Sequence, residues 1–275
     1  MKNLIIRTIT GLFFITLVIS SIFVSKYLFY FVFLGFSLLG TYEFWKMSRL
    51  NEQKPQLILP LLLTSIVFSS VFFIESSALI ILIAAGVVTA LLIPSVEMYR
   101  KHKSPMEHIM GAYLPSLWVA VPLGIVGLWA YGTFTGNTMV LALFIVIWLF
   151  DTLAYCAGSL FGKHRLFERI SPKKSWEGFI VAFIGTAATS VAFAYIPFFE
   201  HTGFNSIGQW LLFASLIMIA STYGDLVESF VKRNYGVKDS GKILPGHGGV
   251  LDRFDSLFFA APIAFFYWII VMYLI

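Results

Sequence analysis

The sequence predicts an all-α polytopic membrane protein that crosses the bilayer about nine times. Three observations support this class: 59% of the 275 residues are hydrophobic, only 12% are charged, and the mean hydropathy is +0.86. A soluble domain has about a quarter of its residues charged, so the composition excludes one. Because basic excess in membrane proteins gathers on cytoplasmic loops, the net charge of +5 does not indicate nucleic-acid binding, and none is expected.

Apolar stretches of about 20 residues, the length that crosses the hydrocarbon core, divide the chain into nine predicted spans. The first resembles a signal peptide, but its apolar run is long, no clear cleavage site follows and further spans come at once, so we expect a retained helix. The single cysteine, Cys156, excludes an intramolecular disulfide and makes a Cys-ligated zinc site implausible. The spans cover residues 4–25, 27–44, 57–74, 78–96, 106–131, 138–161, 176–196, 207–231 and 251–274.

Loop charges orient these spans. With the N-terminus in the cytoplasm, 18 of the 19 Lys and Arg residues lie on the cytoplasmic side and only Lys26 lies outside. We therefore expect a multi-pass protein of the cell inner (cytoplasmic) membrane, with its polar site at the cytoplasmic end of the C-terminal helices. Residues 1–137 form a predicted scaffold of about five spans, almost without ionisable residues at depth. Residues 138–275 form the predicted catalytic region, about four spans with two basic cytoplasmic loops.

The stretch 229–255 concentrates the polar residues of the chain. It holds five of the 19 basic residues, three of the 14 acids and five of the 21 glycines. Cationic side chains, backbone left bare by glycine and carboxylates that can hold a divalent metal together suit a polyphosphate. The alternative is a solvated cytoplasmic loop that is basic because of membrane orientation.

Acids within the spans are candidates for function, because a carboxylate at membrane depth is costly. Asp151 and Asp225 qualify, and Asp225 shares a helix face with Glu228 and Lys232, roughly 10 Å from the cytoplasmic end. Asp252 and Asp255 lie on the first turn of the next span. Two antiparallel neighbouring helices would bring Asp225, Asp252 and Asp255 together as ligands for Mg²⁺. Alternatively, Asp252 and Asp255 complement the helix dipole and pair with nearby basic residues, Arg253 or Lys232.

The glycine-rich turn before Asp252 offers backbone N–H groups at Gly246, Gly248 and Gly249, which predicts an anion-binding nest. His247 is either a hydrogen-bond donor to phosphate or a structural histidine. The other histidines show no metal-ligand spacing, and we expect them at the surface: His102, His108, His164 and His201.

In the second basic loop, Ser171-Pro172 or Ser175 is expected to begin the next helix, with Glu177 in its first turn. Lys173 and Lys174 then lie at the height of lipid headgroups. They either hold an anionic lipid or a nucleotide, or are only the positive charge of a cytoplasmic loop.

One long motif resembles a known family. The chain reads Ser229-x-x-Lys232-Arg233, four residues, Lys238-Asp239-x-Gly241, then Leu244-Pro245-x-His247-Gly248-Gly249-x-x-Asp252-Arg253-x-Asp255. These 27 positions resemble, without a departure, the signature of CDP-diacylglycerol synthases, also called phosphatidate cytidylyltransferases. The SPKKSWEG and DTLAYCAG segments are similar to stretches of the same family.

The resemblance implies a nucleotidyltransferase of phospholipid biosynthesis that converts CTP and phosphatidate to CDP-diacylglycerol and pyrophosphate. It implies a requirement for Mg²⁺, with a second cation that is K⁺ in our expectation, and a homodimer. Asp225, Asp252 and Asp255 are then the metal carboxylates. The expected catalytic group is Lys232, Arg233, Lys238, Asp239, His247 and Arg253, and the expected substrate-binding group is Asp151, Lys173, Lys174, Ser175, Gly246, Gly248 and Gly249.

Other activities remain open from the residues. A CTP-dependent kinase of dolichol, phytol or another lipid alcohol would use a related site but release CDP, and a CDP-activated ether-lipid synthase is a closer variant. A CDP-alcohol phosphatidyltransferase would show a D-G-x-x-A-R motif, which the sequence lacks. A transporter would more naturally show broken helices in both halves.

Overall fold

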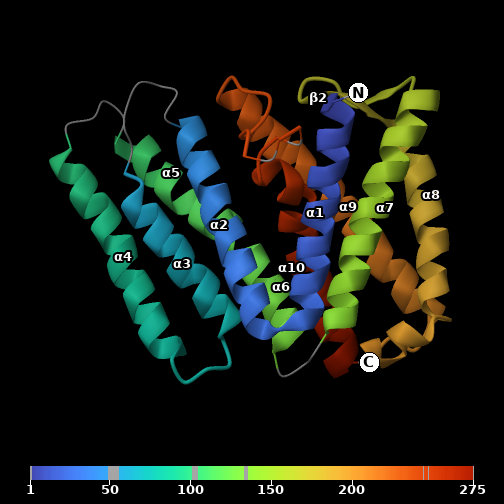
Figure 1. Ribbon diagram of the computed structural model, residues 1–275, viewed down its shortest axis with the longest axis horizontal. Coiled ribbons are helices and arrows are strands. Elements are labelled where there is room, and N and C mark those ends of the chain that lie inside the picture. Colours follow the sequence, from blue (N-terminus) through green and yellow to red (C-terminus); the bar gives the residue numbers. More distant parts are fainter. Residues whose placement is uncertain are drawn as a thin grey trace. The chain divides into compact units, whose positions relative to one another are not determined.

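The computed structural model describes residues 2–48, 56–100, 105–132, 136–243, 245–246 and 248–274. It is 81% helical, which confirms the all-α polytopic class (Figure 1). Its helices are α1 (Lys2–Val24), α2 (Lys26–Ser48), α3 (Ile58–Phe72), α4 (Leu79–Tyr99), α5 (Pro105–Trp118), α6 (Ala120–Tyr131), α7 (Asn137–Phe161), α8 (Trp176–Phe193), the 3-10 helix η2 (Pro197–Thr202), α9 (Ile207–Asn234) and α10 (Leu251–Leu274).

Eight helical stretches of the described chain are long and apolar enough to cross a membrane, and α3 is a shorter apolar helix. Each of the nine predicted spans thus coincides with a helical stretch. The third is shorter than expected, because α3 has 15 residues and extends only about 22 Å. The fifth is interrupted at Val119, between α5 and α6. Pro122 explains this break, because a proline cannot donate to the carbonyl four residues earlier, here that of Trp118.

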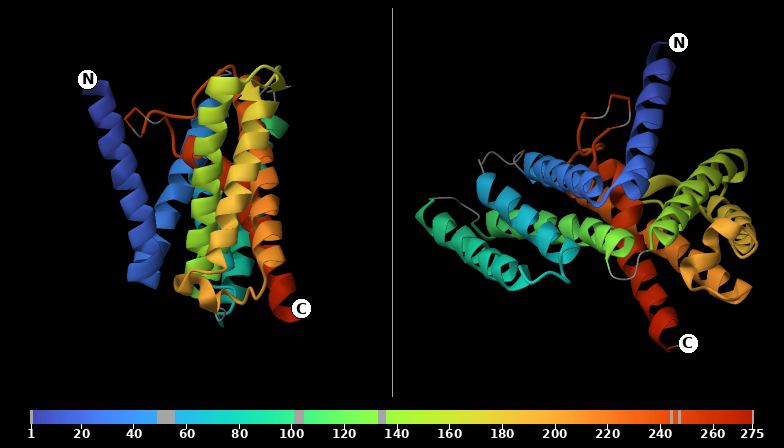
Figure 2. Two further views of the ribbon diagram at one scale, coloured as in Figure 1. Left: turned by 90° about the vertical axis from the view of Figure 1, so that its right-hand side faces the viewer. Right: turned by 60° about the horizontal axis from the view of Figure 1, so that its bottom comes forward.

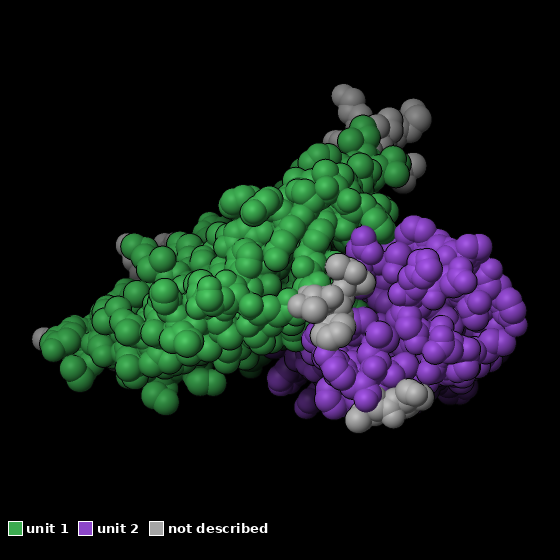
Figure 3. Space-filling view, turned by 90° about the horizontal axis from the view of Figure 1, so that it is seen from below, with its two compact units in different colours: residues 1–135, 234–254 green, residues 136–233, 255–275 purple. Residues whose placement is uncertain are grey.

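The chain forms two compact units (Figure 3). Unit 1 contains residues 1–135 and 234–254, and unit 2 contains residues 136–233 and 255–275. Residues 234–254 therefore belong to the same unit as the predicted scaffold. The predicted division of labour between residues 1–137 and 138–275 stays a prediction.

Unit 1 is built around α2, whose Phe29, Phe33 and Phe44 are fully buried. Its neighbour α3 lies beside α4 (Figures 1 and 2). Buried hydroxyls join α2, α3 and α5. The hydroxyl oxygens of Thr41 and Thr64 are hydrogen-bonded at 2.9 Å, and the Thr64 hydroxyl donates to that of Ser116 at 3.1 Å. Hydrogen bonds of this kind satisfy polar groups that neither lipid nor an apolar core could solvate.

A second polar contact in unit 1 corrects one expectation. His108, predicted at the surface, has a side chain that is only 11% exposed, and its Nδ1 lies 2.9 Å from Oε1 of the buried Glu97. The sequence did not reveal this pair because Glu97 ends one helix and His108 begins the next. His102 lies outside the described residues, and His164 and His201 are exposed as expected.

Unit 2 contains α7 and α8, which lie side by side (Figures 1 and 2). Glycine allows this close approach, since a Cβ at Gly178 would lie 2.8 Å from the carbonyl oxygen of Ala154 and 2.9 Å from Cα of Gly158. In the same unit, Trp268 of α10 donates its indole N–H to the carbonyl of Thr202 in η2 at 2.9 Å. Tyr267 donates to the carbonyl of Gln209 at 3.2 Å.

A short hairpin precedes α8 where the sequence predicted only a loop. Strands β1 (Arg165–Phe167) and β2 (Ser171–Ser175) pair antiparallel, with Arg165 opposite Ser175. Strands of three and five residues are too short to show a period of two in the sequence. Of the two predicted starts for the next helix, Ser175 is confirmed: its hydroxyl accepts the Gly178 N–H at 3.2 Å as the N-cap of α8. The alternative start at Ser171-Pro172 is wrong, because both residues lie in β2.

Candidate functional site

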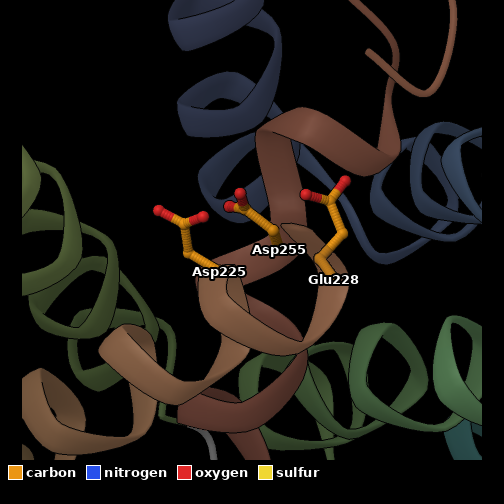
Figure 4. Close-up of side chains that lie close together, drawn as sticks. All are labelled: Asp225, Glu228 and Asp255. Carbon is orange, nitrogen blue, oxygen red and sulfur yellow. The ribbon is translucent and has the colours of Figure 1, made fainter. Parts of the chain in front are cut away.

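Three carboxylates of unit 2 converge between α9 and α10. Asp225 and Glu228 come from α9, and Asp255 comes from the first turns of α10 (Figure 4). Each offers an oxygen that lies within 4.8 Å of the oxygens of the other two. Glu228 is buried, whereas Asp225 and Asp255 are partly exposed. Such a group can share one hard cation, because carboxylate oxygens are the protein ligands that Mg²⁺ prefers.

Local sequence explains why the three acids meet. Asp225 and Glu228 are three residues apart and therefore share one face of α9. Gly224 lies directly against α10: a Cβ at this position would be 2.4 Å from the carbonyl oxygen of Asp255. Ser229 donates to Asp225 Oδ1 at 3.2 Å, and the Ser256 N–H donates to Asp255 Oδ1 at 2.7 Å. Glycine thus permits the close helix approach, and the two serines orient the carboxylates.

Two lysines accompany the acids. Lys174 of β2 places Nζ 2.7 Å from Asp225 Oδ2. Lys232, one turn along α9 from Glu228, forms an ion pair with its carboxylate and is itself buried. The cluster therefore carries three potential negative and two positive charges, a mixture that can bind a cation and an anionic ligand together.

Asp151 also approaches this cluster, from α7. Ser256 donates to its Oδ2 at 3.4 Å, and Ser256 directly follows Asp255. Asp151 itself is exposed, and it was predicted to contact a substrate. That predicted role stays a prediction.

Asp252 has a different environment, in unit 1. Its carboxylate accepts the Ser240 N–H and hydroxyl, each at 3.0 Å to Oδ2, and the Gly249 N–H at 2.8 Å. It therefore braces the glycine loop, by which we mean residues 240–243, 245–246 and 248–250. Of the three predicted metal carboxylates, Asp225 and Asp255 lie together with Glu228. The third, Asp252, instead accepts hydrogen bonds from the glycine loop. Whether Asp252 also binds a metal stays a prediction.

Glu43, which lies on α2 and is 1% exposed, is a contact of this loop that was not predicted from the sequence. Its Oε1 accepts the Val250 N–H at 3.0 Å, and its Oε2 accepts the Leu251 N–H at 2.9 Å and the Ser240 hydroxyl at 3.2 Å. The carboxylate thus meets the start of α10, where it is favoured by the helix dipole and satisfies amides that have no intrahelical partner. The only indication in the sequence was that Glu43 is an acid near the end of the predicted span 27–44.

These contacts change the interpretation of the glycine loop. Gly246 and Gly248 have φ of 77° and 85°, a left-handed backbone that favours glycine. A Cβ at Gly241 would lie 2.3 Å from Glu43 Oε1, and one at Gly248 would lie 2.7 Å from Asp252 Oδ2. The absence of side chains at these glycines therefore lets the carboxylates of Glu43 and Asp252 approach the loop backbone. A phosphate that approached the Gly249 N–H, as the predicted nest requires, would compete with Asp252.

The remaining predicted residues are placed as follows. Lys173, Arg233, Lys238, Asp239 and Arg253 are exposed, which leaves their side chains accessible to solvent. Ser175 is 4% exposed and caps α8, so its local role is structural, and its predicted contact with substrate stays untested. His247 lies outside the described residues.

The fold and this cluster define a class: a helical multi-pass membrane protein with an acidic, lysine-flanked centre between two of its spans. The model of the cytidylyltransferase family matches residues 5–271, and the chain belongs to that family. The expected family is therefore confirmed.

Curated relatives carry a more specific name. The phosphatidate cytidylyltransferase of Staphylococcus haemolyticus is 45% identical over 130 residues, which are 46% of this chain and 48% of that protein. Those of Staphylococcus aureus (strain COL) and Thermotoga maritima are 43% identical over 130 residues and 44% identical over 119 residues. These matches cover 46% and 43% of this chain, and 48% and 44% of the two relatives. The matched part of the chain spans about half the length of these relatives.

Proposed function

We propose that the protein is a phosphatidate cytidylyltransferase, which converts CTP and phosphatidate to CDP-diacylglycerol and pyrophosphate. Membership of the cytidylyltransferase family and the names of the relatives support this activity. The observation that carries it is the convergence of Asp225, Glu228 and Asp255 beside two lysines. Reactants that are both phosphate anions need this combination of a cation site and fixed positive charge.

The acidic cluster fits a divalent cation, because three carboxylate oxygens within 4.8 Å of one another can share one ion. We assign Asp225, Glu228 and Asp255 as the residues that would hold it, and Mg²⁺ as the ion. When bound, it would neutralise substrate phosphate charge and stabilise the departing pyrophosphate. A second cation such as K⁺, and Asp252 as its ligand or a shared ligand, remain part of the proposal through the family signature.

The chain's own residues supply positioning and charge. The attacking group is the phosphate of phosphatidate, an anion near neutral pH, so its attack on the α-phosphorus of CTP requires no strong general base. Lys174 and Lys232 reduce the repulsion between two anions at the acidic cluster. By the signature, Arg233, Lys238, Asp239, His247 and Arg253 contact CTP and its phosphates. Lys173 and Asp151 contact the substrates beside the cluster.

The surroundings of the site are also part of the proposal. The distribution of Lys and Arg supports an N-terminus in the cytoplasm, and the bacterial origin of the relatives supports a location in the inner membrane. Phosphatidate then enters from the bilayer and CTP from the cytoplasm. A homodimer follows from the family resemblance.

The activity is tested with the purified full-length protein in detergent, given CTP, Mg²⁺ and phosphatidate. We expect equal amounts of pyrophosphate and CDP-diacylglycerol, and loss of both when CTP or phosphatidate is omitted. Release of CDP with a lipid alcohol as acceptor would instead establish a kinase. Absence of any nucleotide turnover would reject both enzymatic assignments.

A further inference from the structure

Glu43 joins the second helix of the chain to a loop that lies far along the sequence. It is 207 residues from Val250, yet its carboxylate accepts the N–H groups of Val250 and Leu251 and the hydroxyl of Ser240. All four residues belong to unit 1. The carboxylate is buried, so its charge is stabilised by these donors rather than by water.

The glycine loop is shaped around this carboxylate. A Cβ at Gly249 would lie 2.5 Å from Glu43 Oε2, and one at Gly241 would lie 2.3 Å from Glu43 Oε1. Asp252 accepts the N–H groups of Ser240 and Gly249. Four backbone amides of one short segment, those of Ser240, Gly249, Val250 and Leu251, therefore donate to two carboxylates.

Such bracing matters because the loop is conformationally permissive. Its left-handed glycines, Gly246 and Gly248, have wide backbone freedom, and ordering them on ligand binding would reduce affinity. A loop that is already held in one conformation avoids that loss. Glu43 supplies the connection that holds it to α2.

We propose that Glu43 is a positioning residue for CTP binding: it holds the glycine loop, and with it the exposed Lys238 and Arg253 beside its two ends, in the conformation that receives the nucleotide. This inference rests on the proposed function, in which the loop contributes to the CTP site. Glu43 acts through the loop and does not contact the substrate. Through Glu43, helix α2 of the predicted scaffold takes part in substrate binding.

Glu43→Gln is the variant of choice, because glutamine has the same shape but replaces one accepting oxygen with a donor. At least one of the three donors around residue 43 then loses its acceptor, and two lose it where the amide nitrogen takes the place of Oε2. We expect the KM for CTP and the Kd of labelled CTP, measured by equilibrium dialysis without phosphatidate, to rise by roughly tenfold or more. The KM for phosphatidate should stay within about threefold of the wild-type value.

Glu97→Gln is the matched control. Glu97 is another buried glutamate of unit 1, 2% exposed, but it pairs with His108 rather than with the loop. A merely structural role of buried glutamates would lower the yield of folded protein in both variants and leave the KM for CTP unchanged. We expect the rise in KM and Kd for CTP in Glu43→Gln alone.

Ser240→Ala keeps the test decisive where Glu43→Gln does not fold, because it removes only the hydroxyl that Glu43 and Asp252 share. We expect it to raise the Kd for CTP in the same direction, by a few fold. Wild-type affinity for CTP in a folded Glu43→Gln protein, or in Ser240→Ala where the first does not fold, overturns the inference. Wild-type protein that binds CTP but releases no pyrophosphate overturns the proposed function only, and wild-type protein that does not bind CTP overturns both.

Discussion

Lys174 Nζ lies 2.7 Å from Asp225 Oδ2, so a cationic side chain contacts the acidic cluster at one of its proposed metal ligands. The two side chains are 28% and 30% exposed, and the pair is therefore only partly shielded from water. A divalent cation would compete with this lysine for the carboxylate. With a cation bound there, the ammonium group would be available to an anionic substrate beside it.

The first prediction concerns this competition. Removing the ammonium in Lys174→Ala makes the cluster more negative, so the Mg²⁺ concentration that gives half-maximal thermal stabilisation should fall, by up to about fivefold for a pair worth at most about 1 kcal/mol. The KM for phosphatidate or CTP should rise, because a substrate-neutralising charge is lost. Lys173→Ala is the matched control. Removing this exposed neighbour of Lys174 should also weaken substrate use, but it should leave the Mg²⁺ midpoint unchanged. Equal Mg²⁺ midpoints for wild type and Lys174→Ala would contradict the competition.

The second prediction concerns the ligand set. Asp225→Asn, Glu228→Gln and Asp255→Asn remove one negative charge each from the cluster and keep the side-chain shape. We expect each variant to insert in the membrane but to lose pyrophosphate release by about two orders of magnitude or more, with Mg²⁺ no longer raising its thermal stability. Glu200→Gln, which changes an exposed acid of η2, should behave as wild type.

Glu228 is the informative member of this set, since it also pairs with Lys232. If it serves only as the counter-ion of that lysine, Glu228→Gln should retain the wild-type response to Mg²⁺. That result would remove Glu228 from the metal centre and favour Asp252 as the third carboxylate. Loss of the Mg²⁺ response in Glu228→Gln and its retention in Asp252→Asn would support the cluster as assigned here.

The sequence allowed the spans and two of the three clustered acids to be predicted, because both depend on local patterns. Long apolar runs separated by basic loops locate the helices, and the i, i+3 spacing places Asp225 and Glu228 on one face. Asp225 and Asp255 were expected to meet because they lie at the ends of consecutive spans. The same spacing argument paired Asp252 with Asp255, although Asp252 instead accepts hydrogen bonds from Ser240 and Gly249.

Contacts between distant parts of the chain could not be predicted in this way. Nothing near Glu43 in the sequence indicates that it accepts the amide of Val250, 207 residues later. The break at Val119 depends on which of several prolines interrupts a helix, and prolines such as Pro94 and Pro262 remain inside theirs. The hairpin before α8 depends on a pairing of very short strands. In each case tertiary contacts decide between outcomes that the local sequence permits.

The third prediction concerns Gly224, which determines how closely α9 approaches α10. Alanine in a helix is favoured over glycine by about 1 kcal/mol, so Gly224→Ala should stabilise α9 taken alone. Its Cβ would, however, lie 2.4 Å from the carbonyl oxygen of Asp255 and 3.2 Å from Cα of Ser256, and backbone atoms cannot turn aside as a flexible side chain can. The helices must separate, and the carboxylate of Asp255 moves away from those of Asp225 and Glu228. We expect at least a tenfold loss of pyrophosphate release and a higher Mg²⁺ midpoint in Gly224→Ala.

Gly208→Ala on the same helix is the control, because the nearest atom to its Cβ is Ser206 Oγ at 3.9 Å, and it should retain wild-type turnover. Wild-type turnover and Mg²⁺ response in Gly224→Ala would show that the close approach of α9 and α10 is not required for the site.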